Sequence, residues 1–561
     1  MPTPCFIEKI PNDVLVHIFG QLLDVVSWGP WKVDNLRIAS HVCARWRHLV
    51  LQSAWLWARL IDVGIMGKWC KPWREEFMER TGCAMLHVYG HVETVEASDF
   101  LDTIMSKYWA RVQHFDMLFC KDPSSTVMDT IFLQQAPNLV TFDFKSYVDL
   151  GEALQSGQQR TLFHNYAPAL RVVSSNSLVL PTNAPSFFRG LTCLEMPISS
   201  SSSASEVLNV LKATPLLQKL VLALNYRDKH IPSRHHSNSL HPVHLQDLRE
   251  IDIQHTLPMC SALIPNIHFQ GDKPLRIART YCCGGRDSRD ALDLSIFALD
   301  FATLVPVFVD HCRSIVSSWT WASEVMPRLE ITITNQYRLR VLLKSDILEP
   351  VELNMGSYCE VRNLPADPPF EQLWTALSTL DFNNVRVMEL FDISSRHRTP
   401  KCAAFFLLFS SIKKVTLFID NDNSGFVVWL LILVFNGVGR PSDHEALAFP
   451  SLTVLSIVFL SSRPPASTLH SIVLFLAQRK ERGQPIQLLE LSMDNSVAEV
   501  QADCTGLDTI EGLVVHFNSE WSNSSGYSEP DWKYVCGSGN PSRLHFELED
   551  DDEVPSENSS D

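Results

Sequence analysis

The chain has 561 residues, of which 45% are hydrophobic and 20% are charged, and its formal net charge is −16. This composition is that of a folded protein with enough apolar residues for a sizeable core, which excludes a chain that depends on disulfides or metals to hold it together. The negative charge argues against a general affinity for nucleic acid, because phosphate groups repel such a field.

The cysteines and the first residues of the sequence indicate the cellular compartment of the protein. The sequence holds 14 cysteines, none of them in a C-x-x-C spacing. The opening, MPTPCFIEKIPND, has an acid and two prolines where a signal peptide would have an apolar region. We therefore expect reduced, mostly buried thiols in a cytosolic or nuclear protein. The longest apolar run, FVVWLLILVF at 426–435, is shorter than the roughly 20 residues that a membrane span needs, so a buried helix or strand is predicted there.

The first predicted element is an amphipathic helix in IPNDVLVHIFGQLL. Four apolar residues recur there at i, i+3, i+4 and i+7, the spacing of one helix face: Leu15, Ile18, Phe19 and Leu22. Asn12 or Asp13 can cap this helix. A second helix is predicted over Leu36–Val50, and the short cluster AWLWARL follows it. A unit of about 60 residues buries little by itself, so we expect a partner or the next domain to complete it.

These stretches carry a family resemblance. IPNDVLVHIF, ASHVCARWRHLV and SAWLWARL follow, in order, the F-box pattern of L-P-x-E-hydrophobic-L…I-F, then V-C-[RK]-x-W, then [LS]-W. Residues 8–62 therefore resemble an F-box. The segment LDVVSWGPWKVDN, at 23–35, departs from the family because it is longer than the usual connection and carries its own Trp28 and Trp31.

The resemblance implies a partner and a set of contacts. F-box domains bind the Skp adaptor, which links them to a cullin scaffold. The adaptor-binding residues that the resemblance implies are Pro11, Leu15, Ile18, Val42 and Trp55. The F-box core residues that it implies are Phe19, Cys43 and Trp46. The same residues also fit a second interpretation, an aromatic-rich hydrophobic hairpin within an all-helical domain.

A loose repeat follows, from about residue 120 to 520. APNLVTFDF, TPLLQKLVLAL and FPSLTVLSIVF share the form apolar-x-x-apolar-x-apolar behind a proline, and its last half alternates as a strand does. Weaker copies start at Leu170, Leu191, Leu248, Val385, Ile412 and Ile486. Helix-like stretches such as SEVLNVLKA precede many copies. A lone helix–turn–strand unit cannot bury both its faces, so the units are expected to stack.

The predicted fold class is α/β, a small helical F-box followed by an irregular α/β solenoid. The solenoid resembles the divergent leucine-rich repeats of F-box proteins, fungal ones included, and an unrelated α/β domain is the alternative. Residues 63–119 are expected to link the F-box to the repeats and pack on them, and 255–345 fits the repeat register worst. Residues 521–546 are expected to be irregular. The tail 547–561 carries eight acids and is expected to be disordered.

Two clusters were weighed as chemical sites. Six histidines gather between His230 and His255, and Cys282 and Cys283 stand beside two glycines. A metal site needs several ligands on rigid elements, and neither an H-E-x-x-H motif nor a cysteine pair accompanies the histidines, so a solvated loop is predicted. No histidine at a fixed spacing supports a reactive thiol. We therefore expect no catalytic residue, no metal and no cofactor.

Together these patterns predict a non-catalytic substrate-recognition subunit of a Skp–cullin–F-box (SCF) ubiquitin ligase. The F-box would bind the Skp adaptor, and through it a cullin, while the repeat domain would bind a target protein for degradation. Neither nucleic acid nor a membrane is an expected partner. Two other classes stay open: an adaptor-independent scaffold that keeps the F-box fold, and an enzyme whose site is assembled from scattered residues.

Overall fold

The computed structural model describes most of the chain. The described residues are 10–24, 31–148, 161–199, 201–224, 240–255, 257–269, 275–281, 302–310, 312–313, 328–333, 339–344, 351–356, 368–383, 385–391, 400–419, 449–459, 466–493, 501–518 and 532–547. They fall into two compact units, Met1–Ile251 with Asn266–Gln270 (unit 1) and Asp252–Pro265 with Gly271–Asp561 (unit 2). Both units combine helices with mainly parallel strands, so the predicted α/β class is confirmed.

Unit 1 begins with four short helices: α1 (Asn12–Asp24), α2 (Trp31–Val42), α3 (Ala44–Gln52) and α4 (Ala54–Ala58). The start of α1 agrees with the predicted cap region. The single helix predicted over Leu36–Val50 is wrong, because the chain leaves helical geometry at Cys43, where φ is −157° and ψ is 167°. The segment around Trp28 lies outside the described residues, whereas Trp31 forms the first residue of α2.

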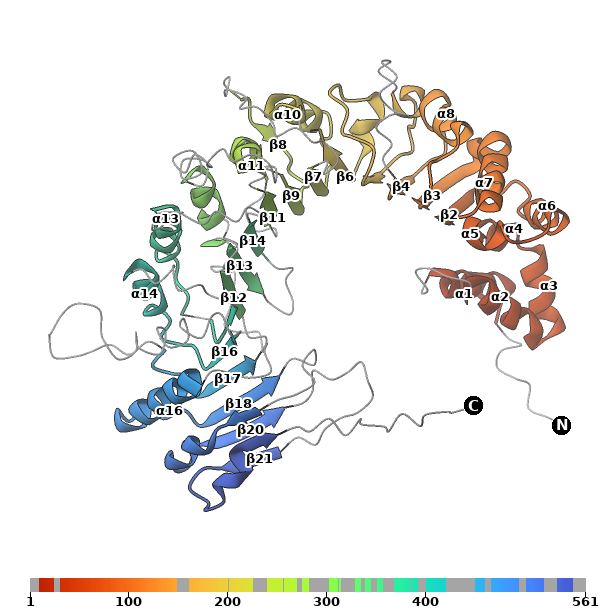
Figure 1. Cartoon of the computed structure of the whole chain (residues 1–561). Coiled ribbons are helices and arrows are strands. Elements are labelled where there is room, and N and C mark those ends of the chain that lie inside the picture. Colours follow the sequence, from red (N-terminus) through yellow and green to blue (C-terminus); the bar gives the residue numbers. More distant parts are fainter. Residues whose placement is uncertain are drawn as a thin grey trace, which may run out of the picture. The chain divides into compact units, whose positions relative to one another are not determined.

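A ladder of parallel strands follows in unit 1. Each described strand pairs with the next one in the chain: β1 (Ile61–Asp62), β2 (Leu86–Val92), β3 (Val112–Phe119), β4 (Thr141–Ser146), β5 (Val172–Ser175), β6 (Cys193–Ile198) and β7 (Lys219–Leu224). The helices between them are α5 (Val63–Met66), α6 (Lys71–Arg80), α7 (Val95–Tyr108), α8 (Ser125–Leu133) and α10 (Ala204–Lys212). Figure 1 shows α7, α8 and α10 on the same side of these strands.

Short elements complete unit 1. The 3₁₀ turns are η2 (Trp109–Arg111), η3 (Leu162–Asn165) and η4 (Ser186–Gly190). A small parallel pair joins β8 (Val243–His244) to β10 (Ile267–His268). The strand β9 (Glu250–Gln254) begins at the end of unit 1. The segment 63–119, which was expected to be a linker, contributes β2 and β3 to the same ladder as β4.

A repeated pair of hydrogen bonds sets the register of the ladder. An apolar residue closes a turn by donating its N–H to the carbonyl three residues earlier, as Leu217 does to Thr214 at 3.2 Å. The next residue then donates to the equivalent position before the preceding strand, as Gln218 does to Thr192 at 2.7 Å. These bonds align each strand with its neighbour, so side chains of one kind fall side by side on each face.

The strands lie where the repeat pattern predicts them. Each of the nine segments singled out in the sequence contains a strand that begins two residues after its leading apolar residue. These strands are β4, β5, β6, β7, β9, β15, β16, β17 and β18. The leading residue is buried in every case, and in seven of the nine its N–H closes the turn before the strand. That these units are leucine-rich repeats of a solenoid stays a prediction.

The core of unit 1 lies on one face of the ladder. Buried side chains occupy matching positions on successive strands: Phe115, Phe142, Val173, Leu194 and Leu220. The rings of Phe115 and Phe142 stack with their centroids 5.5 Å apart. Because aromatic rings bury large apolar areas, this row contributes strongly to the stability of the unit.

Unit 2 mixes parallel and antiparallel pairs. The parallel run joins β12 (Arg328–Ile333), β15 (Val387–Phe391), β16 (Lys414–Ile419), β17 (Val454–Phe459), β18 (Leu488–Met493) and β20 (Val514–Asn518). The helices are α11 (Leu257–Leu263), α13 (Pro368–Leu377), α14 (Pro400–Phe406) and α16 (Ala466–Glu481), with the 3₁₀ turns η5 (Ile264–Asn266), η8 (Thr505–Thr509) and η10 (Pro541–Leu544).

Antiparallel strands explain why part of unit 2 did not fit the repeat. β12, β13 (Leu339–Lys344) and β14 (Val351–Gly356) pair antiparallel, and β14 then pairs parallel with β11 (Leu275–Tyr281). The segment 521–546, expected to be irregular, contains β21 (Trp532–Val535), which pairs antiparallel with β20. β22 (His545–Glu547) pairs antiparallel with β19 (Gln501–Asp503). Both corrections have one cause, since strands that return along their neighbours lack the helix–turn–strand pattern.

Several expectations fall outside the described residues. These are the apolar run at 426–435, the Cys282–Cys283 pair, the histidines at 230, 235 and 236, and the acidic tail from 548 to 561. The cysteines within the described residues are all free of disulfides, and they range from buried, as at Cys402, to exposed, as at Cys70. The expectation of mostly buried thiols therefore holds for only part of this set.

Candidate functional site

The four N-terminal helices form a small core around one side of α1. Leu15, Phe19 and Leu23 recur every four residues and are all buried. The ring of Trp46, from α3, packs edge-on against Phe19 with the centroids 5.0 Å apart. Phe19 is fully buried, and Trp46 is partly buried against it. The sequence predicts Leu15 on an exposed, adaptor-binding face of α1. In the structure its side chain is only 1% exposed, so this prediction is wrong.

Cys43 differs from the core role expected of it. Its side chain is exposed, and it caps the N-terminus of α3, where its Sγ accepts a hydrogen bond from the backbone N–H of Trp46 at 3.5 Å. An N-cap residue needs extended backbone and turns its side chain toward the first amides of the helix. That geometry directs the thiol away from the helical core.

A second row of apolar residues on α1 stays open to solvent. Val14, Ile18 and Leu22 are each between 41% and 43% exposed, and their spacing of four residues places them along one line of the helix. We call these three residues the apolar stripe. Sequence reasoning named Ile18 but missed Val14, although the pattern V-x-x-x-I-x-x-x-L contained the signal.

The other expected adaptor contacts are accessible as well. Val42 is 58% exposed near the end of α2, and Ile38 lies exposed one turn before it. Pro11 is exposed just before α1. Exposed aliphatic residues four apart on two helices leave apolar area that the small unit does not bury.

Trp55 links α4 to α1 and is partly exposed. A Cβ atom added at Gly20 would lie 2.2 Å from Cη2 of the Trp55 ring, so the ring rests directly on the glycine. The guanidinium of Arg59 lies over the Trp55 ring, 4.9 Å from its centroid. Trp55 therefore has a packing role beside any contact with a partner.

Arg45 ties α3 to the beginning of α1, a role that sequence reasoning did not find. Its Nε donates to Oδ1 of Asn12 at 2.9 Å, and its Nη2 donates to the carbonyl of Ile10 and to Asn12 Oδ1. Asn12 is thus held by the arginine of the C-x-R-W stretch. This contact joins two segments of the motif that lie 33 residues apart in the chain.

The face of the unit 1 ladder opposite the core carries polar side chains in register. One row across successive strands consists of Tyr89, Asp116, Asp143, Ser174, Glu195 and Val221. We call Asp116, Asp143 and Glu195 the acidic row. Two lysines lie beside it: Nζ of Lys145 is 2.7 Å from Oδ2 of Asp143, and the charge of Lys219 interacts with that of Glu195.

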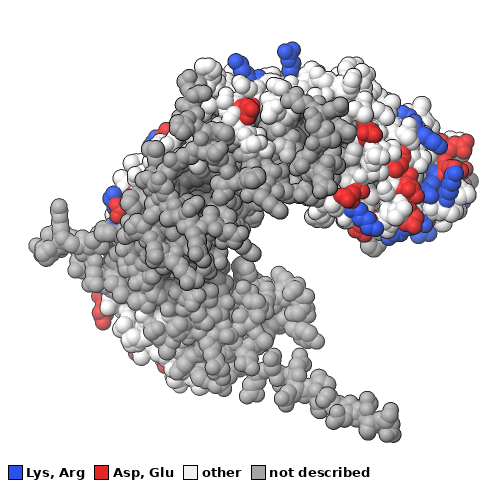
Figure 2. Space-filling model, turned by 45° about the horizontal axis from the view of Figure 1, so that its top comes forward, with Lys and Arg blue, Asp and Glu red and all other residues white. Residues whose placement is uncertain are grey.

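The electrostatics of this row are dominated by the carboxylates. Burial alone would lower the pKa of Lys145, but its hydrogen bond to Asp143 and the charges of Asp116 and Glu195 raise that pKa above its ordinary value. Lys145 therefore stays charged and offsets one of the three carboxylates. Elsewhere on the described surface that Figure 2 shows, charges of both signs are interspersed.

A histidine pair lies at the start of the same face. The rings of His87 and His114 are 4.1 Å apart, and Nδ1 of His114 lies 3.1 Å from Oγ1 of Thr141. Burial, and then the charge of Arg59, lower the pKa of His114. A neutral His114 at pH 7 follows from this shift.

The described part of the chain has few side chains arranged for catalysis or for metal binding. No group of three or more histidine, cysteine, aspartate or glutamate side chains is placed there to hold a metal ion. His241 and His244 lie in or beside β8, and His255 is buried, with its pKa lowered to about 4 by burial. Burial raises the pKa of Cys193 to about 11, which keeps that thiol protonated and weakly nucleophilic.

The comparison with protein families decides what the N-terminal helices are. Residues 7–62 match the model of the F-box-like family. Residues 7–62 form an F-box-like domain. No curated protein matches the chain. F-box domains typically bind the Skp adaptor, which links them to a cullin, and F-box proteins are generally non-catalytic. No helix among the described residues is both long and apolar enough to cross a bilayer.

The contact between Gly20 and Trp55 gives a prediction about the F-box-like domain. We expect Gly20→Val to destabilise it by about 1–3 kcal/mol, the usual cost of overpacking, because the new side chain overlaps the Trp55 ring. Limited proteolysis should then cut α1 and α4 faster. In a Trp55→Ala background the same change should cost almost nothing, since valine is no worse than glycine in a helix. An equal cost in both backgrounds would show that the ring does not rest on Gly20.

Proposed function

We propose that this chain is a substrate-recognition subunit of a Skp–cullin–F-box ubiquitin ligase. The observation that carries the proposal is the apolar stripe of the F-box-like domain. Val14, Ile18 and Leu22 expose aliphatic side chains on the helix that opens the F-box motif. A folded helical unit that leaves such a row uncovered is suited to a partner that covers it. The Skp adaptor is the partner typical of this domain.

The proposed mechanism is tethering. The F-box-like domain holds the adaptor and its cullin, and the α/β remainder holds a target protein. Together, these two contacts raise the effective concentration of target lysines near the charged conjugating enzyme. Any linked pair of binding modules has this effect. On this proposal the chain supplies no catalytic residue. The alternative, an adaptor-independent scaffold, differs in one respect, because it would not co-purify with a Skp adaptor.

The strand face of unit 1 is the proposed target-binding surface. Its acidic row presents three carboxylates, Asp116, Asp143 and Glu195, with Lys145 bound to Asp143 and Lys219 within reach of the charge of Glu195. These side chains are half-buried, so they lie on a surface that a partner can cover without displacing the core. The charge favours a target segment that contains lysine or arginine.

Ile18→Asp tests the adaptor surface. We expect this variant to lose Skp adaptor binding at least tenfold in a pull-down titration, because the carboxylate would be buried without a partner in the interface. Its thermal stability should match that of the wild type, since Ile18 is 41% exposed. Leu133→Asp is the matched control, an exposed leucine on α8 that should bind the adaptor normally.

Leu15→Asp distinguishes the effect of a buried residue of α1 from that of the exposed apolar stripe. Leu15 is buried, so this change should unfold the F-box-like domain and lose adaptor binding as a consequence, with rapid proteolysis of α1. If Ile18→Asp binds the adaptor as tightly as the wild type, the apolar stripe is not the adaptor surface and the ligase proposal fails.

The acidic row is tested with Asp143→Asn combined with Glu195→Gln. Proteins that co-purify with the wild type and become ubiquitinated by its complex should be lost from this variant, whereas adaptor binding should persist. Glu75→Gln combined with Glu79→Gln removes the same charge from the exposed side of α6 and serves as the control. Unchanged target capture by the acidic-row variant would place the target surface elsewhere.

A further inference from the structure

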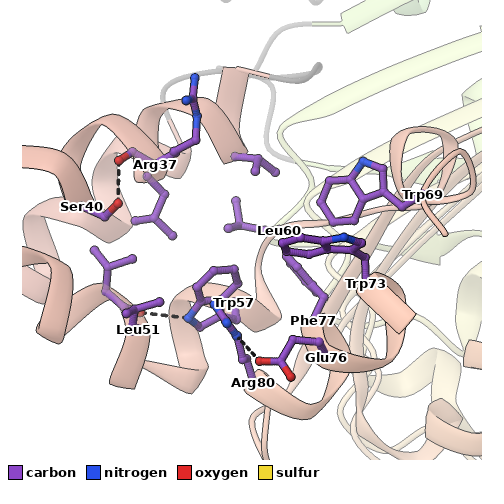
Figure 3. A pocket seen from close by; sticks show the side chains of 13 residues that line it. Arg37, Ser40, Leu51, Trp57, Leu60, Trp69, Trp73, Glu76, Phe77 and Arg80 are labelled. Carbon is purple, nitrogen blue, oxygen red and sulfur yellow. Dashed lines mark hydrogen bonds and ion pairs between the residues drawn. The ribbon is translucent and has the colours of Figure 1, made fainter. Parts of the chain in front are cut away.

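A cavity lies beside the F-box-like helices, within unit 1 (Figure 3). Its volume is about 230 Å³, and its walls come from α2, α3, α4, α6 and the segments between them. The lining is mostly apolar, with Leu36, Leu51, Trp57, Trp69 and Phe77 as its main contributors. We call it the junction cavity, because the F-box-like domain and α6 meet there. Neither the adaptor nor the target surface proposed above includes it.

The aromatic walls of the junction cavity are held in place by their own contacts. The indole N–H of Trp57 donates to the carbonyl of Val50 at 2.9 Å, so this ring has no free donor. Phe77 packs edge-on against Trp57 and Trp69, with centroid distances of 5.2 and 5.9 Å. Trp73, at the open side, is 65% exposed. The walls are therefore preformed, as in most small-molecule sites.

The size of the cavity limits what can enter it. About 150 Å³ of apolar cavity is enough to hold benzene, whereas drug-sized ligands use pockets of roughly 300–1,000 Å³. A volume of about 230 Å³ therefore fits one or two fused rings with a small substituent. Flat rings suit the walls, because Trp57, Trp69 and Phe77 offer aromatic surfaces for stacking or edge contacts.

The charged groups of the lining favour an anion. Arg80 uses only its Nε to bind Oε1 of Glu76, at 2.8 Å, and its guanidinium lies 4.9 Å from the centroid of Trp57. Its Nη groups have no acceptor among the described residues. Arg37 likewise binds Asp34 through Nε, although it points away from the rings in Figure 3. Each guanidinium thus pairs with one carboxylate through its Nε, and the Nη groups of Arg80 are the donors left for the anionic group of a ligand.

We propose that the junction cavity binds a small compound with a flat apolar body and one anionic group, of the aryl carboxylate class. Its rings lie against Trp57, Trp69 and Phe77, and its carboxylate accepts hydrogen bonds from the Nη groups of Arg80. Such a ligand touches both the F-box-like helices and α6, and it therefore stabilises their packing. The site stands independently of the proposed ligase function.

Calorimetric titration of the full chain with 2-naphthoate tests the proposal. We expect binding to one site, and about fivefold weaker binding of the neutral analogue 2-naphthalenemethanol, because a partly exposed ion pair contributes modestly. Arg80→Gln should reduce the affinity for 2-naphthoate to that of the alcohol and leave the alcohol unaffected. Leu51→Trp, which puts a larger side chain at a lining position, should weaken both ligands.

Arg59→Gln is the matched control. Arg59 also stacks over a tryptophan, Trp55, but it does not line the junction cavity, so both ligands should bind this variant as they bind the wild type. Equal affinities for the acid and the alcohol, full binding to Leu51→Trp or no binding at all would overturn the proposal. Displacement of 2-naphthoate by the Skp adaptor would also overturn it, because the cavity would then be part of a protein interface.

Discussion

Helix α1 carries two rows of apolar residues, and a four-helix unit of this size buries only one of them. Leu15, Phe19 and Leu23 are buried, Phe19 against Trp46 of α3, whereas the apolar stripe beside them stays open. Covering one partly exposed aliphatic side chain is worth on the order of 1 kcal/mol. The free chain therefore keeps an apolar surface whose burial can drive association. The account of function rests on this imbalance.

The ladder of unit 1, in contrast, buries the apolar residues of one whole face. Its turns and the bonds between equivalent positions hold the strands in one register, so one face becomes a continuous aromatic and aliphatic core. The other face carries polar side chains, and the shared register aligns them in rows. Phe77 of α6 packs on Trp57 of α4, which joins the F-box-like domain to the start of the ladder.

The sequence predicted the positions of helices and strands better than it predicted which of their residues are buried. The strand after Leu217 was evident, because an apolar residue, two spacers and an alternating run describe a buried turn and a half-buried strand. The break at Cys43 was not, since no glycine or proline marks it and the cap depends on a thiol. Which row of α1 is buried was also missed, because that depends on where α2 and α3 pack. Leu15 and Ile18 are equivalent in the sequence pattern but not in the fold.

The acidic row on the ladder could not be predicted from the sequence for a related reason. Asp116, Asp143 and Glu195 are far apart in the chain, and they form a row only because four strands, β3 to β6, share one register. No spacing along the chain indicates this. The antiparallel strands β12 to β14 escaped prediction because their pairing is set by neighbours rather than by a repeated motif. In each case the missing information was tertiary.

Hydrogen exchange of the full chain, with and without the Skp adaptor, tests the central claim most directly. The account predicts that the adaptor slows exchange of backbone amides in α1 and α2, from residue 12 to 42, because the apolar stripe and Val42 become covered. The amides of β3 to β7 should exchange at the same rate in both samples. Unchanged exchange in α1, at adaptor concentrations that saturate other F-box proteins, would contradict the account.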